Sequence, residues 1–440
     1  MWRFFLITLL ISSLFSAPAS ASWLNQLGNG DSNASYIGVG AAGPSRAAAC
    51  GYVNTGSSPQ VLYATTSTGD SWSEGGGFAG YGAALEFASE SVGFIGGLIG
   101  KVWRTTDGGA SWIELPEATV GGGTMMDSDF VADIAISPDG QTVWVLGASG
   151  ECAVSDDQGN SWSKVELDLL AGTSITAGAL LGDSVWIVGG TSPEEPVEGS
   201  DFEDPSPGHP AGDGFVLYSA DGGDSFDLLA SGLEHQLTEV SFVNPAEGWA
   251  AAATYLEGGA AIARTSDGGE SWELIQIDGF PDGEVVGVGM GASTVPAGCS
   301  FVEFFGREVG VAVCTTATFD SDGSTGLFLS VDGGESWEHQ LGYKDSFPNQ
   351  LIAAGEVIDT AMVDCHRGWL VGEGKIIQRW DNDDADLDCE QGGAPSEDVP
   401  EDLAEQDDGS SDGDDCGCTT PGAAAVGPGS LISLILNLFR

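Results

Sequence analysis

The side chains of this sequence that are best suited to catalysis or to metal binding are its many carboxylates. The chain has 66 Asp and Glu residues against 12 Lys and Arg, which gives a formal net charge of −54. Two carboxylates on either side of a glycosidic bond suffice for its hydrolysis, and carboxylates also bind Ca²⁺. An Asp recurs at one position of an eight-residue segment, [S/T]-x-D-x-G-x-S-[W/F], which we call the Asp-turn segment. Its six copies cover residues 65–72, 105–112, 155–162, 219–226, 265–272 and 330–337.

The composition of the Asp-turn segment predicts a tight turn. The Asp side chain can accept hydrogen bonds from backbone N–H groups across the turn, the Gly allows a positive φ, and the closing aromatic residue buries a large apolar area. Only the first copy lacks the Asp, which is replaced by Ser67. We therefore interpret these residues as structural rather than catalytic or metal-binding. They are Asp107, Asp157, Asp221, Asp267 and Asp332, with the closing aromatics Trp72, Trp112, Trp162, Phe226, Trp272 and Trp337.

The spacing of the Asp-turn segments predicts the fold. Their closing aromatics follow one another at intervals of 40 to 65 residues, which suits one four-stranded propeller blade with loop insertions. Short apolar stretches before the turns, such as residues 92–104 and 237–242, are typical of strands, and a degenerate seventh copy covers residues 380–387. The sequence therefore predicts an all-β protein, a seven-bladed β-propeller of four-stranded antiparallel blades over residues 35–390.

The path of the chain through such a blade assigns residues to the two faces of the ring. The turns between strands 1 and 2 and between strands 3 and 4 emerge on one face, and the remaining loops emerge on the other. A sialidase-like site needs three arginines on the second face to grip a substrate carboxylate. Six arginines are instead predicted on the Asp-turn face: Arg46, Arg104, Arg264, Arg307, Arg367 and Arg379.

The face opposite the Asp-turn segments carries the long insertions, and binding residues commonly lie on loops held by a rigid scaffold. Acidic and apolar residues of these loops are the candidate binding residues, although the same loops could serve only for solubility. They are Glu194, Glu195, Asp201, Phe202, Phe319, Asp320 and Asp322, with Met125 and Met126 beside them.

Motifs for other chemistry are missing from the sequence. The four histidines have no metal-ligand spacing, and no nucleophile elbow, P-loop or dinucleotide fingerprint occurs. We therefore predict no catalytic residues, no metal site and no cofactor. A faint calcium-loop pattern at residues 381–388 lacks the central Gly and distal Glu of an EF-hand, so calcium is at most a weak expectation. The strong negative charge excludes nucleic acid as a partner.

The repeats resemble those of the BNR/Asp-box superfamily of propellers, which includes sialidases and sortilin-like proteins. The pattern G-W-x-x-G followed by R-T-x-D-G-G-x-S-W looks most like the photosystem II stability/assembly factor type. The resemblance covers about 350 residues and implies the fold rather than the function. It also implies that Arg104, Arg264 and Arg379 could form a patch like that of the assembly factors. Pairing of these arginines with acids of the turns is the interpretation that we favour.

Both ends of the chain resemble targeting segments. Residues 1–21 have the basic start, short apolar stretch and A-x-A site of a signal peptide, so we expect cleavage after Ala21. Residues 391–415 are predicted to form an acidic disordered linker. Residues 416–440, with Cys416, Cys418 and an apolar stretch, resemble a myxosortase-type sorting signal, although a single basic residue ends it. A plain C-terminal membrane anchor is the alternative.

The even number of cysteines in a chain with an export signal favours disulfides. Cys299 and Cys314 lie at equal distances from the centre of a predicted hairpin, so we predict a disulfide between them. The sequence does not settle the pairing of the others, Cys50, Cys152, Cys365 and Cys389.

These observations together predict an exported, non-catalytic, surface-displayed propeller that binds a protein or glycan partner. We expect a monomer at the cell surface or outer membrane, held by a membrane or lipid anchor or released. The alternative is a glycan-processing hydrolase with a carboxylate site on the face opposite the Asp-turn segments.

Overall fold

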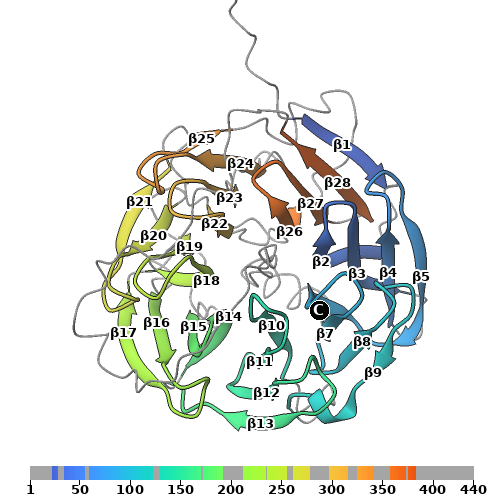
Figure 1. The fold of residues 1–440 in the computed structure, drawn as a ribbon, viewed down its shortest axis with the longest axis horizontal. Coiled ribbons are helices and arrows are strands. Elements are labelled where there is room, and N and C mark those ends of the chain that lie inside the picture. The colour runs from blue at the N-terminus through green and yellow to red at the C-terminus, as the bar shows by residue number, and fades with distance from the viewer. Residues whose placement is uncertain are drawn as a thin grey trace, which may run out of the picture.

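The chain folds into a seven-bladed β-propeller, which confirms the predicted fold class (Figure 1). The computed structural model describes residues 22–27, 34–54, 59–121, 129–169, 172–191, 212–233, 235–254, 261–277, 297–315, 325–339, 357–372 and 375–382. Each blade is an antiparallel sheet of four strands, and the sheets surround a central axis. Within the described residues the one helix is a single 3-10 turn, η1 (Pro116–Ala118), and no helix is long and apolar enough to cross a membrane.

The first three blades follow the chain in order, each running from its innermost to its outermost strand. Blade 1 contains β2 (Ala34–Gly43), β3 (Arg46–Asn54), β4 (Pro59–Thr66) and β5 (Ser73–Ala79). Blade 2 contains β6 (Gly82–Phe87), β7 (Gly93–Gly97), β8 (Val102–Thr105) and β9 (Ile113–Glu114). Blade 3 contains β10 (Val131–Ile136), β11 (Val143–Gly147), β12 (Glu151–Ser155) and β13 (Ser163–Glu166).

Blades 4, 5 and 6 repeat this order. Blade 4 contains β14 (Thr173–Leu181), β15 (Ser184–Thr191), β16 (Gly212–Ser219) and β17 (Asp227–Leu233). Blade 5 contains β18 (Gln236–Phe242), β19 (Gly248–Thr254), β20 (Ala261–Thr265) and β21 (Glu273–Gln276). Blade 6 contains β22 (Ala297–Phe304), β23 (Gly310–Thr315), β24 (Thr325–Ser330) and β25 (Glu338–His339). A short pairing of β19 with β22 joins blades 5 and 6 into one continuous sheet.

Blade 7 is built from both ends of the described chain. Its three inner strands are β26 (Val357–Asp364), β27 (Arg367–Gly372) and β28 (Ile376–Asp381), and its outermost strand is β1 (Ser22–Leu27). β1 pairs antiparallel with β28, with Trp23 opposite Trp380, and the two strands lie side by side in Figure 1. The propeller therefore begins at Ser22, upstream of the predicted start at residue 35. The predicted seventh Asp-turn copy lies outside the described residues beyond Asn382.

The hydrophobic core consists of layers between neighbouring blades. Inner and second strands are buried on both faces, because each blade packs against a neighbour on either side, so β11 is apolar at nearly every position. One layer joins Phe94 of blade 2 to Val131 and Val145 of blade 3, and another joins Tyr36 of blade 1 to Trp369 of blade 7. The second of these layers closes the ring.

The predicted disulfide between Cys299 and Cys314 is present. The two residues are directly opposite each other in the pairing of β22 with β23. Cys50 and Cys152 are free and buried. Cys365 is also disulfide-bonded, and its partner lies outside the described residues.

Candidate functional site

Each of the six Asp-turn segments lies between the third and fourth strands of its blade, as the sequence predicts. In blade 2, Asp107 Oδ1 accepts hydrogen bonds from the hydroxyl of Thr105 (2.8 Å) and the backbone N–H of Ser111 (2.8 Å). Its Oδ2 accepts one from the hydroxyl of Ser111 (2.6 Å). The Thr105 hydroxyl in turn accepts the N–H of Gly109 (2.9 Å). The carboxylate is therefore surrounded by donors of its own turn.

The other four Asp-turn carboxylates have the same partners in their own segments. They are Asp157, Asp221, Asp267 and Asp332. Hydrogen bonds from Ser161 lower the pKa of Asp157 to about 2, and those from Ser219 and Ser225 lower the pKa of Asp221 to about 2. These groups are ionised near neutral pH, when they act as hydrogen-bond acceptors.

The closing aromatics of the Asp-turn segments contact other aromatic rings at the seams between blades. Trp72, Trp162 and Phe226 meet Trp369, Phe94 and Trp144 of the preceding blade edge to face. Trp272 and Trp337 do so through Phe242 and Phe304, which stack on Trp186 and Trp249 of the preceding blade with ring centroids 3.9 and 3.6 Å apart. Trp112 meets Phe87 of its own blade and Tyr63 of the preceding one.

The six arginines lie at the predicted turns and third-strand ends, and most bond to a neighbouring blade. Arg104 donates to the side chain of Asn160 in the Asp-turn segment of blade 3 (3.0 Å). Arg379 binds Asp70 in that of blade 1 (2.7 Å). The contacts of Arg46, Arg307 and Arg367 likewise join adjacent blades, whereas Arg264 lies over the ring of Trp249 in its own blade. Most of these guanidinium groups therefore link neighbouring blades and stabilise the ring.

A Tyr–Glu pair of the kind that some glycosidases use as a nucleophile does occur, with the tyrosine buried and the glutamate exposed on β5, the outermost strand of blade 1. The Tyr36 hydroxyl donates to Glu74 Oε1 (3.0 Å), and Lys375 forms an ion pair with the same oxygen. Tyr36 is buried, and its burial together with the negative charge of Glu74 raises the pKa of its hydroxyl. A neutral, buried phenol cannot reach a substrate, so this group is a seam contact between blades 7 and 1.

The predicted binding residues on the opposite face all lie outside the described residues: Glu194, Glu195, Asp201, Phe202, Phe319, Asp320 and Asp322, with Met125 and Met126. The same holds for Cys416, Cys418 and the signal peptide, and for all of the faint calcium pattern except Asp381 and Asn382. No group of three or more potential metal ligands occurs in the part of the chain that the structure describes.

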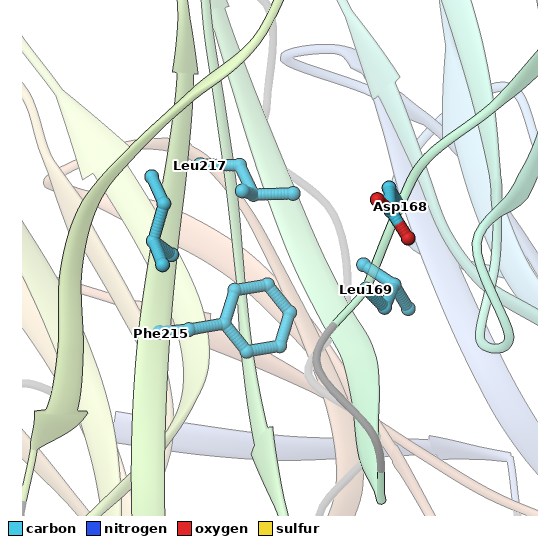
Figure 2. Close-up of a pocket in the computed structure, with 5 residues that line it drawn as sticks. Asp168, Leu169, Phe215 and Leu217 are labelled. Carbon is cyan, nitrogen blue, oxygen red and sulfur yellow. The ribbon is translucent and has the colours of Figure 1, made fainter.

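A small pocket lies at the outer side of the seam between blades 3 and 4. Figure 2 shows Asp168 and Leu169, just after β13, facing Phe215 and Leu217 of β16, with Leu228 of β17 completing the lining. Its volume of about 40 Å³ is enough for a few water molecules. This pocket is too small to hold a sugar ring or a large peptide side chain.

Five buried carboxylates on the innermost strands were missed by the sequence analysis. They come from five blades: Glu86 of β6, Asp133 of β10, Glu239 of β18, Glu303 of β22 and Asp359 of β26, each at most 5% exposed. Each is an acid within a short apolar strand, a pattern that in the sequence alone also fits an exposed position. We define these five residues as the axial carboxylates.

The axial carboxylates differ in their partners. Asp133 accepts hydrogen bonds from the backbone N–H groups of Ile134 (2.6 Å) and of Gly178 in the next blade (2.9 Å). Asp359 does the same with Thr360 (2.6 Å) and Val39 (2.6 Å). These two side chains thus join blade 3 to blade 4 and blade 7 to blade 1.

Glu86 and Glu239 have fewer hydrogen-bond partners than Asp133 and Asp359. Neither oxygen of Glu86 has a hydrogen-bond partner, and Oε2 of Glu239 has none. Burial, together with the charges of other axial carboxylates, raises the pKa of Glu86 and of Glu239 well above the ordinary value. Burial raises the pKa of Asp133 to about 7. The group as a whole holds protons or needs a counter-charge.

Comparisons with known proteins bear on the fold. No family model matches the chain, and no curated protein matches its sequence. YCF48 from Cyanidioschyzon merolae is similar in structure, with a TM-score of 0.50 and 13% identity over 82% of this chain and 98% of that one. The likeness shows the fold alone.

Two further structures are more distantly similar. YCF48 bound to D1 peptide has a TM-score of 0.38 and 15% identity, and covers 68% of this chain and 91% of that one. The GH74 xyloglucanase from Xanthomonas campestris has a TM-score of 0.47 and 15% identity, and covers 81% of this chain and 53% of that one.

Proposed function

We propose that the protein is an exported, surface-displayed propeller that serves as a non-catalytic binding or assembly scaffold for a protein or glycan partner. One observation carries the proposal: the side chains whose spacing suggested chemistry are bonded within the ring itself. The Asp-turn carboxylates are enclosed by their own turns, and arginines such as Arg104 and Arg379 hold adjacent blades together. A ring braced in this way is suited to presenting loops in fixed positions.

The likeness to YCF48 is one of fold, so the proposed partner class rests on this chain's own features. The composition supports a partner with positive or neutral contact surfaces, because 66 acidic residues repel anions. The insertions on the face opposite the Asp-turn segments supply the proposed contact surface, and its candidate residues are those predicted from the sequence.

A screen of the purified full chain for binding and for turnover tests the proposal. We expect saturable binding to a protein or glycan ligand and no sustained hydrolysis of a panel of chromogenic glycosides. Repeated turnover of any glycoside would replace the scaffold with the hydrolase alternative. Turnover that is lost in the Asp133→Asn variant would place that activity at the axial carboxylates.

Export and display need a separate experiment in the native host. N-terminal sequencing of the mature protein is expected to begin at Ser22, which is also the first residue of β1. Surface display predicts that protease added to intact cells digests the protein. Protection from the protease until the cells are lysed would contradict display but leave the binding function standing.

A further inference from the structure

The axial carboxylates lie at related positions in their strands. Each of the five innermost strands has a register shift near its start, and Asp133, Glu239 and Asp359 are the residues just after that shift. Glu86 and Glu303 lie two residues further along their strands. Two residues of a strand span about 7 Å. The carboxylates therefore form two layers along the axis, with the Glu86 and Glu303 layer nearer the Asp-turn face.

The five carboxylates share one region rather than five separate environments. Glu86 of blade 2 is close enough to Glu303 of blade 6, Asp133 of blade 3 and Asp359 of blade 7 for their charges to act on it. Glu239 of blade 5 is affected by the same three carboxylates. The innermost strands that carry these residues, β6, β10, β18, β22 and β26, surround the axis of the ring (Figure 1).

A second observation separates this group from an ordinary cluster of acids. Glu86 is 1% exposed, and neither of its oxygens has a partner with full hydrogen-bond geometry; a weaker contact with the backbone N–H of Phe87 only opposes the rise in its pKa. Buried polar atoms are nearly always paired in folded proteins, and an unpaired buried carboxylate is costly. The Glu86 carboxyl therefore has unused capacity to accept hydrogen bonds in the region that it shares with the other axial carboxylates.

The chemistry of a donor that would use this capacity can be narrowed. A metal ion held by three or more carboxylates does not fit, because no such group of ligands is close enough together among the described residues. An ammonium or guanidinium group does fit, since it offers three to five N–H donors to carboxylates that stand further apart. Two layers about 7 Å apart further favour a ligand with more than one positive charge along its length.

We propose that the axial carboxylates bind an extended organic cation, a multiply protonated amine or guanidinium compound that lies along the axis of the ring. This site is distinct from the loop face of the proposed function. Glu86 and Glu239 supply free oxygens to the ligand, and Asp133 and Asp359 add negative charge while they keep their backbone hydrogen bonds. The cation is either a free polyamine or a run of basic side chains from a partner.

Calorimetric titration of the full chain in metal-free buffer at pH 7 and physiological salt tests the proposal. The probes are spermidine, a tri-arginine peptide and CaCl₂. We expect saturable binding of at least one nitrogen cation. Tighter binding of spermidine would indicate a free polyamine, and tighter binding of the peptide would indicate a basic segment. Binding of Ca²⁺ alone, or no binding of either nitrogen cation at millimolar concentration, would overturn the proposal.

A matched pair of double variants distinguishes the axial site from general attraction to an acidic protein. Glu86→Gln with Glu239→Gln is expected to weaken binding at least tenfold. Glu166→Gln with Glu273→Gln makes the same substitutions at exposed positions on outer strands and is expected to change the affinity less than twofold. Equal losses in both double variants would mean that the cations bind to the acidic surface without a site.

Proton release gives a reading that does not depend on the variants folding. Burial raises the pKa values of Glu86, Asp133 and Glu239, and a cation that binds beside them lowers those pKa values, so binding near the pKa of Asp133 is expected to release protons. Titration of the unmodified protein in two buffers of different ionisation enthalpy measures that release. Binding without proton release would place the cation on surface acids that are already ionised, against the proposal.

Discussion

The carboxylate of Asp359 in blade 7 accepts a hydrogen bond of 2.6 Å from the backbone N–H of Val39 in blade 1. The pairing of Asp133 with Gly178 repeats this contact between blades 3 and 4. An acid on an innermost strand can therefore join two blades through a backbone N–H of the next blade, which any residue except proline would supply.

Replacement of Asp359 by Ala is expected to weaken the seam that closes the ring. The N–H groups of Val39 and Thr360 would lose their buried acceptor, at a cost of about 2 kcal/mol in the free energy of unfolding. Thr360→Val is the control, because the buried Thr360 hydroxyl has no partner and its loss should cost little. Denaturant unfolding of both variants measures the difference, and equal stabilities would refute the role of Asp359.

The indole hydrogen bonds at the seams predict different effects for two buried tryptophans. Trp249 Nε1 donates to the carbonyl of Gly333 in the next blade (3.0 Å), whereas Trp144 Nε1 has no partner. Trp249→Phe should lower the free energy of unfolding by about 1 kcal/mol more than Trp144→Phe does. Thermal unfolding of the two variants gives the comparison. A larger loss for Trp144→Phe would show that ring packing, not the hydrogen bond, dominates.

The free energy of unfolding should depend on pH because of the axial carboxylates. Because burial raises the pKa of Asp133 to about 7, the folded state holds a proton that the unfolded state releases above its ordinary pKa of 3.8. The contribution of Asp133 to the free energy of unfolding is therefore fully present below pH 4. This contribution falls as the pH rises towards 7, by an amount on the order of 4 kcal/mol.

Asp133→Asn cannot ionise and should flatten this dependence. Asp224→Asn, at an exposed position, removes the same charge and should leave the slope as it is. Thermal midpoints between pH 4 and pH 8 measure both. The Asp-turn carboxylates act in the opposite sense, since their lowered pKa values make stability fall as the pH drops from about 4 to about 2.

The closing strand β1 predicts a sharp boundary for truncation. The Gln26 side chain donates to the carbonyl of Gly69 and accepts from Trp72 Nε1 (2.7 Å) and Trp369 Nε1 (3.2 Å). Removal of residues 1–21 should leave the unfolding midpoint unchanged, whereas removal of residues 1–27 should lower it by several degrees. Faster hydrogen exchange in β28 should accompany the second truncation only. An unchanged midpoint after loss of β1 would contradict its role in closure.

Cysteine chemistry gives a further prediction. Mass mapping of the unreduced protein should find Cys299 and Cys314 in one linked peptide. Cys50 and Cys152, being free and buried, should react with an alkylating reagent only after unfolding. Burial raises the pKa of the Cys152 thiol to about 12, which further slows its reaction at neutral pH. Rapid labelling of Cys152 in the folded protein would contradict this burial.

The sequence predicted the parts of the structure whose contacts are local. An Asp-turn segment contains its own donors and acceptor, as Thr105, Asp107 and Ser111 show, so its pattern is visible without knowledge of the rest. The hairpin that pairs Cys299 with Cys314 is equally local.

The contacts that depend on ring closure were not visible in the sequence. β1 pairs with β28, which lies near the other end of the propeller sequence. No local sequence pattern links Trp23 to Trp380. The axial carboxylates were missed for a related reason. An acid such as Glu86 fits the sequence of an exposed strand position, and only the circular arrangement shows that it is buried near acids from three other blades.

The sheet of blade 7 combines β1 with three strands from the other end of the propeller sequence, which affects how the ring closes during synthesis. A chain that leaves the ribosome or a translocon presents β1 first and β28 only after six blades have emerged, so until then the nascent protein is an open arc with an unpaired strand. Exposed edges of this kind promote association between chains. A helper protein that shields the N-terminal strand during this interval would therefore raise the yield of closed rings, and a circular permutant that joins β1 directly after β28 should not need one.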